Sequence, residues 1–442
     1  MARPAARRHP HPARRLDLLL PARHVAPAQP GPHSDPVDPG PAVRAALAGL
    51  ATTIGLVAVL VSSVLASGTI RVAIVENARV VELRGVSIEV NELRGCCPSG
   101  GAWRTDVVRA VAAGQSVEID GRRASGFRLT SERLIRVSGR DYPAALEVVP
   151  NGDGVTVVNE LPLEDYVVGV VRAEAGERWP LQMLRAQAIV ARTYAAYHRT
   201  LNALRPYHIV ASTVHQSYVG HVPSSSPVWE AVRDTRGQVL RWGGGLFPAF
   251  YHATSGGYTE DPRTVFAARN MPALKAIRDE FSVTAPHSAW SLDLRLVDLA
   301  EILRRNGVDV GTVKAVQITE RTPSLRVSTL TIHGTRGSAR LRGNDLRRMV
   351  GYETLKSTLF AVAVDGEKAH FAGRGYGHGV GMSQWGAKAM AEHGYRAEKI
   401  LEYYYPGTTL GPLDEPLART STEPPPPAEP PPSAPFTTAP PW

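Results

Sequence analysis

Two glutamates lie in a short break between two expected helices, and one of them is a candidate general acid. The break reads RAEAGERWP and carries Glu174 and Glu177 beside a Trp-Pro pair. A carboxyl group at such a junction is partly desolvated, and desolvation raises its pKa toward the range in which a neutral acid donates a proton. The ordinary alternative is a solvated loop acid without a chemical role.

Arg192 lies on the second of these helices, at the edge of its buried stripe. At about 100° per residue, it is only about 20° around the helix from Leu181. A guanidinium in that place needs an anionic partner, and Glu174 is the candidate. The alternative is an arginine whose stem is buried and whose charged group reaches solvent.

The segment YHATSGGYTED, residues 251–261, is a candidate ligand-contacting loop. Gly256 and Gly257 follow Ser255 and allow the backbone to approach a ligand closely, with hydroxyl and N–H groups turned inward. The alternative is a Gly-Gly hairpin turn.

A second candidate loop is glycine-rich and reads GRGYGHGVGMSQWGA at residues 373–387. It is expected to present His378, Ser383 and Gln384 to a polar ligand, and Trp385 can stack on a sugar ring. A dinucleotide-binding loop is disfavoured because no strand–turn–helix unit with an acidic residue about 20 positions later accompanies the glycines.

Other familiar chemistries have no motif in this sequence. The GxSxG elbow, the HExxH helix, the P-loop and the CxxC pair are missing from it. The histidines are scattered without zinc-ligand spacing, so neither a metal nor a cofactor is expected. The histidines considered are His208, His215, His252 and His378.

Strands and helices of an α+β fold are expected to position these segments. Residues 71–160 alternate β-branched residues with turn residues and predict a β-rich lobe. A short helix is expected from Leu161 to Val171, and a long one from Pro180 to about Leu201. The expected architecture is β-rich lobes with a helical insertion that carries the active site. Strands are further expected at 238–260 and 313–342. A helix is expected at 294–306, and a helix and a shorter helical turn at 384–405.

The composition fits a globular protein with low-complexity ends. With 43% hydrophobic and 21% charged residues, the chain is neither disordered nor fibrous. Its two cysteines, the adjacent Cys96 and Cys97, exclude a disulfide framework. The net charge of +9 is partly concentrated in an arginine-rich leader, so the remaining bias is too weak for a nucleic-acid-binding face.

Residues 45–70 carry no charge and are bracketed by Arg44 and Arg71. A helix of this length crosses a hydrocarbon layer of about 30 Å, and the basic leader keeps the N-terminus in the cytoplasm. The bulk is then extracytoplasmic on a single-pass anchor. The alternative is a signal peptide cleaved near Ala66, which makes the protein secreted. The expected divisions are a basic leader (1–44), this anchor (45–70), a β-rich lobe (71–160), a catalytic region (161–410) and a Pro-rich disordered tail (411–442).

Taken together, the motifs resemble those of the stage II sporulation protein D (SpoIID/LytB) family. From about residue 71 to 410 the family's order is kept in LPLEDYVVGVVRAEAGERWPLQMLRAQAIVARTYAAYH, HATSGGYTE, GRGYGHGVGMSQWGA and ILEYYYPGTTL. The resemblance implies a bacterial protein that acts on peptidoglycan. Some members are membrane-anchored lytic transglycosylases that cut glycan strands stripped of stem peptides, and others enhance wall amidases.

The resemblance also implies residue roles. Glu174 occupies the place of the family's catalytic glutamate, and Arg192 that of a required arginine. Lys275, in MPALKAIRD, matches a functionally important lysine, but Ala273 stands where relatives have an aromatic residue. Two cysteines that pair or hold zinc in many relatives are replaced here by Val210 and His215, so that feature is absent.

The implied reaction cleaves the bond between N-acetylmuramic acid and N-acetylglucosamine, with Glu174 as acid and base and 1,6-anhydro ends as the product. Hydrolysis with Glu177 or Glu260 as a second carboxylate is the near alternative. The alternative from another class is a non-catalytic, wall-binding activator of an N-acetylmuramoyl-L-alanine amidase. The expected partners are glycan strands and a wall amidase, with no nucleic acid.

Overall fold

The computed structural model describes residues 68–93, 101–266 and 271–414. The expected anchor is almost wholly outside these residues, as are Cys96, Cys97 and most of the Pro-rich tail. The last two residues of the expected anchor, Thr69 and Ile70, begin a β-strand. In the described part of the chain, no helix is both long enough and apolar enough to span a membrane.

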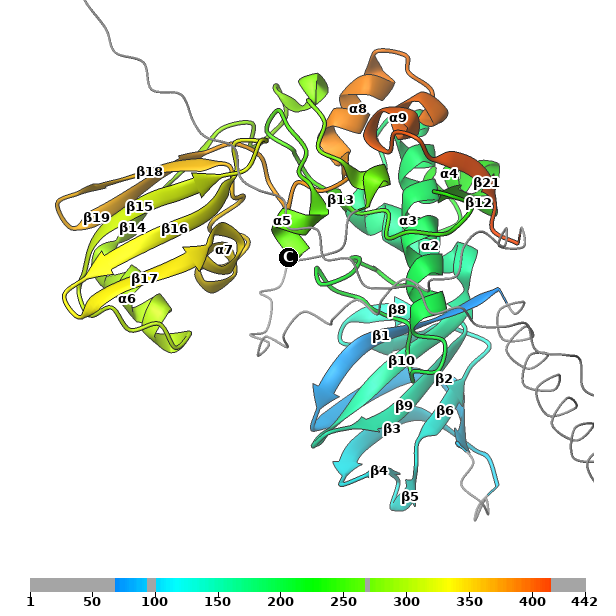
Figure 1. Ribbon diagram of the computed structural model, residues 1–442. Coiled ribbons are helices and arrows are strands. Elements are labelled where there is room, and N and C mark those ends of the chain that lie inside the picture. The colour runs from blue at the N-terminus through cyan, green and yellow to red at the C-terminus, as the bar shows by residue number, and fades with distance from the viewer. Residues whose placement is uncertain (1–67, 94–100, 267–270, 415–442) are drawn as a thin grey trace, which may run out of the picture. The chain divides into compact units, whose positions relative to one another are not determined.

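The first part of the described chain is a β-rich lobe, as the sequence predicted (Figure 1). Its strands and one later strand form a sheet in the order β11-β1-β10-β9-β6-β2-β3-β4-β5, with β7 pairing to both β2 and β8. Alternation of buried and exposed side chains along these strands turns one face toward the core. The strands are β1 (Thr69–Ala78), β2 (Val80–Glu92), β3 (Trp103–Ala113), β4 (Ser116–Ile119), β5 (Arg122–Ala124), β6 (Phe127–Thr130), β7 (Ile135–Val137), β8 (Arg140–Tyr142), β9 (Ala145–Asn151), β10 (Gly154–Pro162) and β11 (Ile209–Val210).

Strand β10 leads directly into the first helix, α2 (Leu163–Glu174), and a short break separates α2 from α3 (Leu181–Leu201). Both helices were predicted, but α2 begins two residues later than expected. The reason is that Leu161 still belongs to β10, where it pairs with Ile70 of β1. The sheet therefore fixes the start of α2, and α2 carries Glu174 at its far end.

The elements that surround α3 come from distant parts of the sequence. Of the strands expected at 238–260, only two short ones form, because Gly243–Gly245 and Pro248 interrupt the extended run. The helix and shorter helical turn expected at 384–405 are present as two helices. The elements are α4 (Val228–Asp234), β12 (Gln238–Arg241) paired with β21 (Thr409–Pro412), β13 (Tyr251–His252) paired in parallel with β20 (Met382–Ser383), α5 (Pro262–Phe266), η1 (Pro272–Leu274), η2 (Glu280–Ser282), α8 (Gln384–Glu392) and α9 (Ala397–Tyr404).

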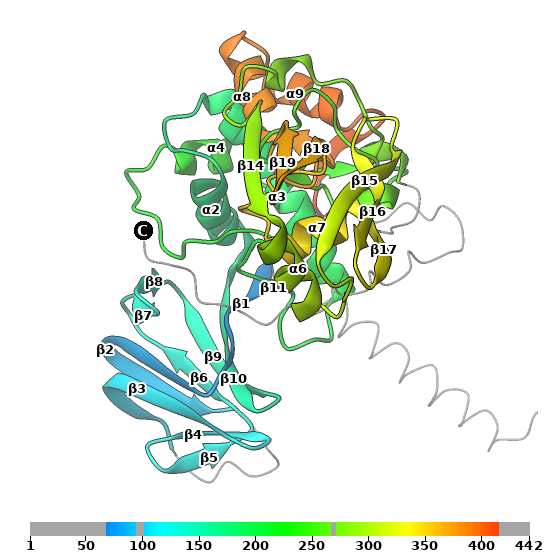
Figure 2. The same cartoon turned by 90° about the vertical axis from the view of Figure 1, so that its left-hand side faces the viewer.

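Residues 290–373 form an inserted domain with a hydrophobic core of its own (Figure 2). Two three-stranded antiparallel sheets, β14-β19-β18 and β15-β16-β17, pack with two helices around Leu299, Leu330 and Phe371. The expected helix and strands at 294–306 and 313–342 are present, whereas β14, β18, β19 and α7 were not predicted. The elements are β14 (Trp290–Arg295), α6 (Leu296–Arg305), β15 (Val313–Arg321), β16 (Val327–Gly334), β17 (Gly337–Arg342), α7 (Gly343–Val350), β18 (Phe360–Asp365) and β19 (Lys368–Gly373).

The β-rich lobe and the helices share one larger hydrophobic core. It includes Leu146 and Val157 of the sheet, Val167 of α2 and Ile189 of α3, all buried. The expected α+β class with a helical insertion therefore agrees with the structure. The shared core holds α2 against the sheet and so determines where Glu174 lies.

Candidate active site

Glu174, the last residue of α2, is hydrogen-bonded by groups from other parts of the chain. Its Oε1 accepts the backbone N–H of Ser217 at 2.7 Å, and its Oε2 accepts a long hydrogen bond from Nε2 of Gln384 at 3.4 Å. The Tyr251 side chain also interacts with the carboxyl group and lowers its pKa. The helix break is thus brought together with both of the loops that the sequence singled out.

A chain of hydrogen bonds behind the carboxyl group orients Tyr251. The Tyr166 hydroxyl donates to Oε1 of Gln216 at 3.2 Å, and Nε2 of Gln216 donates to the hydroxyl oxygen of Tyr251 at 3.2 Å. Tyr166 and Gln216 are fully buried. Because the Tyr251 oxygen accepts from Gln216, its own proton is available to Glu174.

Burial raises the pKa of Glu174, and the hydrogen bonds from Ser217, Gln384 and Tyr251 oppose that effect only in part. The expected desolvation of this carboxyl group is confirmed. Residue Glu174 as a whole is half-buried. A carboxyl group with a raised pKa that a ligand can reach has the properties of a general acid.

Two tryptophans from the segments that carry Glu174 and Gln384 form an aromatic pair. The ring centroids of Trp179 and Trp385 are 5.0 Å apart, and the ring planes are tilted by 59°. Trp385 directly follows Gln384, and Trp179 lies in the same break as Glu174. Both rings are half-buried and so leave apolar surface on which a sugar ring can stack.

Arg192 is fully buried, but its partner is Glu164 and not Glu174 as the sequence suggested. Its Nε and Nη2 atoms donate to the two Glu164 oxygens at 2.9 and 2.7 Å, and Nη1 donates to the carbonyl oxygen of Gln238 at 3.1 Å. Glu164 is in the first turn of α2, about 15 Å along the helix axis from Glu174. Arg192 therefore ties α2 to α3 and β12 and acts on the site by positioning it.

Ser255 and Ser383 belong to a buried network beneath the site. The Ser255 hydroxyl donates to Asp279 at 2.7 Å, and the Ser255 N–H donates to the Ser383 hydroxyl at 3.3 Å. Ser383 also accepts from the N–H of Gly386 and caps α8. The hydroxyl of Tyr404 donates to Asp279 at 3.0 Å. Both serines are fully buried, so their role here is to hold the two loops together.

The Gly-Gly pair was expected to let the backbone approach a ligand closely. At Gly256, the group that lies close is instead another segment of the protein's own backbone. A Cβ at Gly256 would lie 2.8 Å from the carbonyl carbon of Arg374, and Gly256 has a φ of +75°. Thr254 and Tyr376 exchange two backbone hydrogen bonds beside it, at 3.0 and 2.8 Å. Gly257 has a φ of +113° and open space around its Cα.

We expect Gly256→Ala to destabilise the protein more than Gly114→Ala does. Both glycines have a positive φ, +75° and +68°, but a Cβ at Gly114 meets nothing within 4 Å. Alanine therefore has a similar backbone strain at both positions. The difference in the free energy of unfolding between the two variants measures the steric clash at position 256, and we expect it to be about 1–3 kcal/mol. Urea denaturation of both variants measures it. Equal losses would show that the loops can separate at no cost.

His378 is packed among aromatic rings and does not reach Glu174. Its ring centroid lies 5.9 Å from Phe250, 5.2 Å from Phe266 and 5.5 Å from His252, and its Nδ1 accepts the N–H of Val380 at 3.0 Å. Burial lowers the pKa of His378 to about 3, so the imidazole is neutral at physiological pH. The expectation that it faces a polar ligand is not supported by this packing.

The remaining candidates are Lys275, Glu177 and Glu260. Lys275 follows η1 and is exposed. Glu177 forms an ion pair with Arg172 at 2.7 Å, and Glu260 is buried and accepts from the hydroxyls of Thr322 and Ser324 at 2.6 and 2.5 Å. Neither glutamate is hydrogen-bonded to the groups around Glu174. Within residues 68–93, 101–266 and 271–414, no cluster of three or more potential metal-ligating side chains is present.

Four neighbours of Glu174 were not selected from the sequence. Tyr251 lay inside a recognised segment, and Gln216 inside a Gln-x-Tyr motif, but nothing in the sequence indicated their hydrogen bonds to one another. Ser217 acts through its backbone N–H, which carries no side-chain signal. Trp179 could have been found, since it stands in the same break as Glu174.

Comparison with known families gives two matches. Residues 151–242 match the model described as stage II sporulation protein, which spans α2, the break and α3. Residues 269–381 match a domain of unknown function, and this region contains the inserted domain.

Individual proteins of known sequence give the same picture. The chain is 30% identical over 275 residues to an uncharacterized protein of Brachyspira hyodysenteriae, covering 62% of this chain and 73% of that protein. It is 30% identical over 273 residues to stage II sporulation protein D of Bacillus subtilis, covering 58% and 76%. It is 31% identical over 288 residues to the amidase enhancer of Bacillus subtilis, covering 55% of this chain and 40% of that protein. The predicted resemblance is confirmed, and the chain belongs to the stage II sporulation protein D (SpoIID) family.

Proposed function

We propose that this protein is a lytic transglycosylase of the bacterial cell wall. Its substrate is the glycan strand from which stem peptides have been removed, and the bond cut joins N-acetylmuramic acid to N-acetylglucosamine. The observation that carries the proposal is the Glu174 carboxyl group, whose pKa is raised by burial and which is oriented by Ser217 and Gln384.

A single carboxyl group serves both halves of this reaction. The neutral Glu174 gives its proton to the glycosidic oxygen as the bond from that oxygen to C1 of the muramic acid breaks. The carboxylate left behind takes the proton of the C6 hydroxyl as O6 bonds to C1. The product is a 1,6-anhydro ring, no water is consumed, and Glu174 is again protonated. No second carboxylate is needed, which agrees with the other engagements of Glu177 and Glu260.

The surrounding groups have supporting roles in this mechanism. The Ser217 N–H and the Gln384 amide keep the carboxyl group in one orientation, and Tyr251 stabilises the carboxylate when it forms. Trp179 and Trp385 offer an apolar face for a sugar ring. Lys275 is exposed and is proposed to contact the substrate.

The site of action follows from the substrate. We propose that the uncharged segment that begins at residue 45 and precedes β1 anchors the protein in the membrane with residue 71 onward outside the cytoplasm, or is removed as a signal peptide near Ala66. N-terminal sequencing of the mature protein decides between these. A start near Ser67 indicates a secreted protein, and an intact leader indicates an anchored one.

A second candidate function is activation of a wall amidase without catalysis, favoured by the 31% identity to the amidase enhancer of Bacillus subtilis. Purified protein on peptide-free glycan strands separates the two candidates. Mass spectrometry finding anhydro-muramyl ends supports the transglycosylase, and reducing ends indicate hydrolysis. If the protein does not cleave the strands but increases the rate of a wall amidase, the activator function is supported.

The pH dependence of cleavage tests the role of Glu174. The acid must be protonated in the free enzyme, so kcat/KM is high below its raised pKa and falls as the pH rises through it. The Gln384 hydrogen bond lowers that pKa, so we expect Gln384→Leu to move the falling limb of the profile to higher pH. The control is Gln182→Leu, since the amide oxygen of Gln182 accepts the N–H of Ala397. We expect this variant to leave the falling limb of the pH profile where it is in the parent. A limb that stays in place or moves to lower pH in Gln384→Leu would contradict this assignment.

A further inference from the structure

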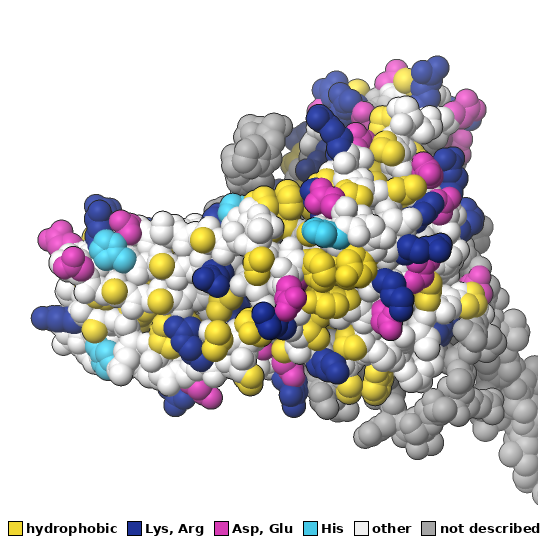
Figure 3. Space-filling model, turned by 90° about the horizontal axis from the view of Figure 1, so that it is seen from above, with side chains coloured by type: hydrophobic (Ala, Val, Ile, Leu, Met, Phe, Trp, Pro, Cys, Tyr) yellow, Lys and Arg dark blue, Asp and Glu magenta, His cyan; other side chains and the backbone are white. Residues whose placement is uncertain are grey.

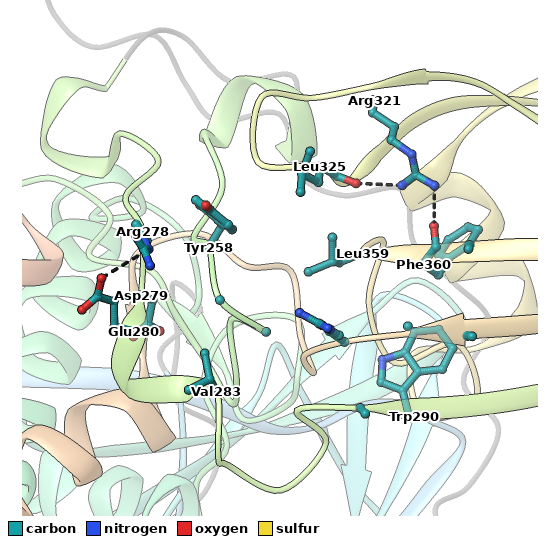
Figure 4. Close-up of a pocket in the computed structure, with 17 residues that line it drawn as sticks. Tyr258, Arg278, Asp279, Glu280, Val283, Trp290, Arg321, Leu325, Leu359 and Phe360 are labelled. Carbon is teal, nitrogen blue, oxygen red and sulfur yellow. Dashed lines mark hydrogen bonds and ion pairs between the residues drawn. The ribbon is translucent and has the colours of Figure 1, made fainter.

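A cavity of about 880 Å³ lies beside the active site and does not include Glu174. One wall comes from residues 256–283 and the other from the inserted domain (Figure 4). The first wall carries Tyr258 and Arg278, and the second carries Arg321 and Phe360. Its size is within the range of sites that take small molecules or short oligosaccharides.

The cavity is connected to the catalytic carboxyl group through a short series of contacts. Asp279, which lines the cavity, accepts the hydroxyl of Ser255. The Ser255 N–H is bonded to Ser383, and the next residue, Gln384, contacts Glu174. The cavity and the Glu174 site are therefore linked through buried side chains of the two loops.

The charges that face the cavity are predominantly positive. Arg278 has a carboxylate partner, Glu280, at 3.3 Å. Among the described residues, the hydrogen bonds of the Arg321 guanidinium go to the carbonyl oxygens of Leu325 and Phe360, at 2.7 and 2.9 Å. Arg374 is exposed, and no described residue hydrogen-bonds or ion-pairs with its guanidinium.

The one buried acid in the wall does not offset these charges. Both oxygens of Asp279 accept hydroxyl hydrogen bonds, from Ser255 and Tyr404, and the side chain is fully buried. Burial raises the pKa of Asp279. Among the described residues its carboxyl group is hydrogen-bonded to these hydroxyls and not to Arg321 or Arg374. Two arginine charges, those of Arg321 and Arg374, are therefore without a carboxylate in the cavity. Such an arrangement suits a ligand that brings a carboxylate of its own.

The rim of the cavity is apolar and held in a defined shape. Tyr258, Val283 and Leu325 are 38%, 55% and 56% exposed. Leu325 has a φ of +67°, which a branched residue rarely adopts, and it is held there by Arg321 and by a turn anchored through Thr322. Figure 3 shows hydrophobic side chains grouped on one face of the molecule beside Lys and Arg side chains. Apolar edges with a few cationic groups are typical of sites that bind charged sugars.

We propose that this cavity binds a muramic acid residue of the glycan strand through its free lactyl carboxylate, with Arg374 as the principal contact. In intact peptidoglycan this carboxyl group is tied up as the amide to the stem peptide. Removal of the peptide frees one carboxylate on each muramic acid, so Arg374 selects the strand that an amidase has already processed. The reaction that supplies the substrate is then hydrolysis of that amide. The inference rests on the proposed function, whose substrate carries the carboxylate.

Binding to chemically matched glycans tests the inference. The full chain carrying Glu174→Gln, which binds without turnover, is titrated with peptide-free strands and with the same strands after their carboxylates are converted to neutral amides. We expect Arg374→Ala in this background to raise Kd for the free-carboxylate strands about tenfold or more, and to leave Kd for the amidated strands unchanged. Arg374→Lys should lose less, since it keeps the charge but not the planar fork.

A matched control is Arg348→Ala, which removes an exposed arginine of α7 that does not line the cavity. It should change neither Kd. An equal weakening for both glycans by Arg374→Ala, or none for either, would overturn the inference. Displacement of the strands by poly(glycerol phosphate) but not by free muramic acid would also overturn it, in favour of a phosphate polymer.

Cleavage by the parent protein, measured alongside, separates this inference from the proposed function. Cleavage of peptide-free strands that is indifferent to Arg374 rejects the cavity assignment alone. Carboxylate-dependent binding through Arg374 without any cleavage by the parent rejects the proposed chemistry and keeps the cavity assignment.

Discussion

Glu174→Gln is expected to reduce glycan cleavage by about 10²- to 10⁴-fold, the usual contribution of a general acid. The amide keeps the shape of the side chain and can still accept the Ser217 N–H, but it has no proton to transfer. Because the parent carboxyl group has a pKa raised by burial, its replacement by a neutral amide should leave the free energy of unfolding unchanged or slightly higher. Product analysis by mass spectrometry and a urea titration measure both effects.

Glu177→Gln is the matched control for this experiment. Glu177 lies three residues further along in the same break and is paired with Arg172 at the surface. Its loss should leave cleavage close to that of the parent, since an exposed ion pair contributes little. Full activity of Glu174→Gln would refute the assignment of the acid. Equal losses in the two variants would mean that local negative charge, and not proton transfer, is what the reaction needs.

Arg192→Ala should have the largest effect on stability. Arg192 is 0% exposed and Glu164 17% exposed, so truncation leaves a largely buried carboxylate without its partner. Loss of one partner of a buried pair costs about 3–5 kcal/mol, and cleavage should fall with the folded fraction. Arg192→Lys should be intermediate, because an ammonium cannot reproduce the two-pronged contact to Glu164. Denaturation curves and activity at matched folded fraction provide the measurement.

Arg185→Ala on the same helix is the control, since it removes an ion pair to Asp234 whose side chains are 26% and 37% exposed. Its cost should stay below about 1 kcal/mol. If Arg192→Ala is as stable as the parent yet inactive, Arg192 takes part in catalysis directly. If Arg192→Lys matches the parent in both respects, the two-pronged contact is dispensable.

The helix break and its glutamate were predictable because local patterns determine them. A stripe of apolar residues marks α3, Pro180 marks its start, and the break before it contains Glu174. The short elements and the inserted domain were harder to predict. Strands such as β13, two residues long, carry no periodic signal, and their pairing with β20 depends on contacts across more than a hundred residues.

The partner of Arg192 was predicted wrongly for a geometric reason. The periodicity of α3 gives the direction in which Arg192 points but not the level at which α2 lies against it. Glu164 and Glu174 are at opposite ends of α2, and only the packing of the two helices decides which one Arg192 meets. Likewise, Ser255 and Ser383 stood in segments with the composition of binding loops, yet the fold buries both.

The two ends of the inserted domain are neighbours, since Trp290 at the start of β14 pairs with Gly373 at the end of β19. A unit whose entry and exit meet in this way can be exchanged during evolution without displacing the chain on either side. It supplies one wall of the cavity, while Arg374 and the Glu174 site lie outside it. The shape of that wall can therefore diverge between relatives while Arg374 and the surroundings of Glu174 stay in place.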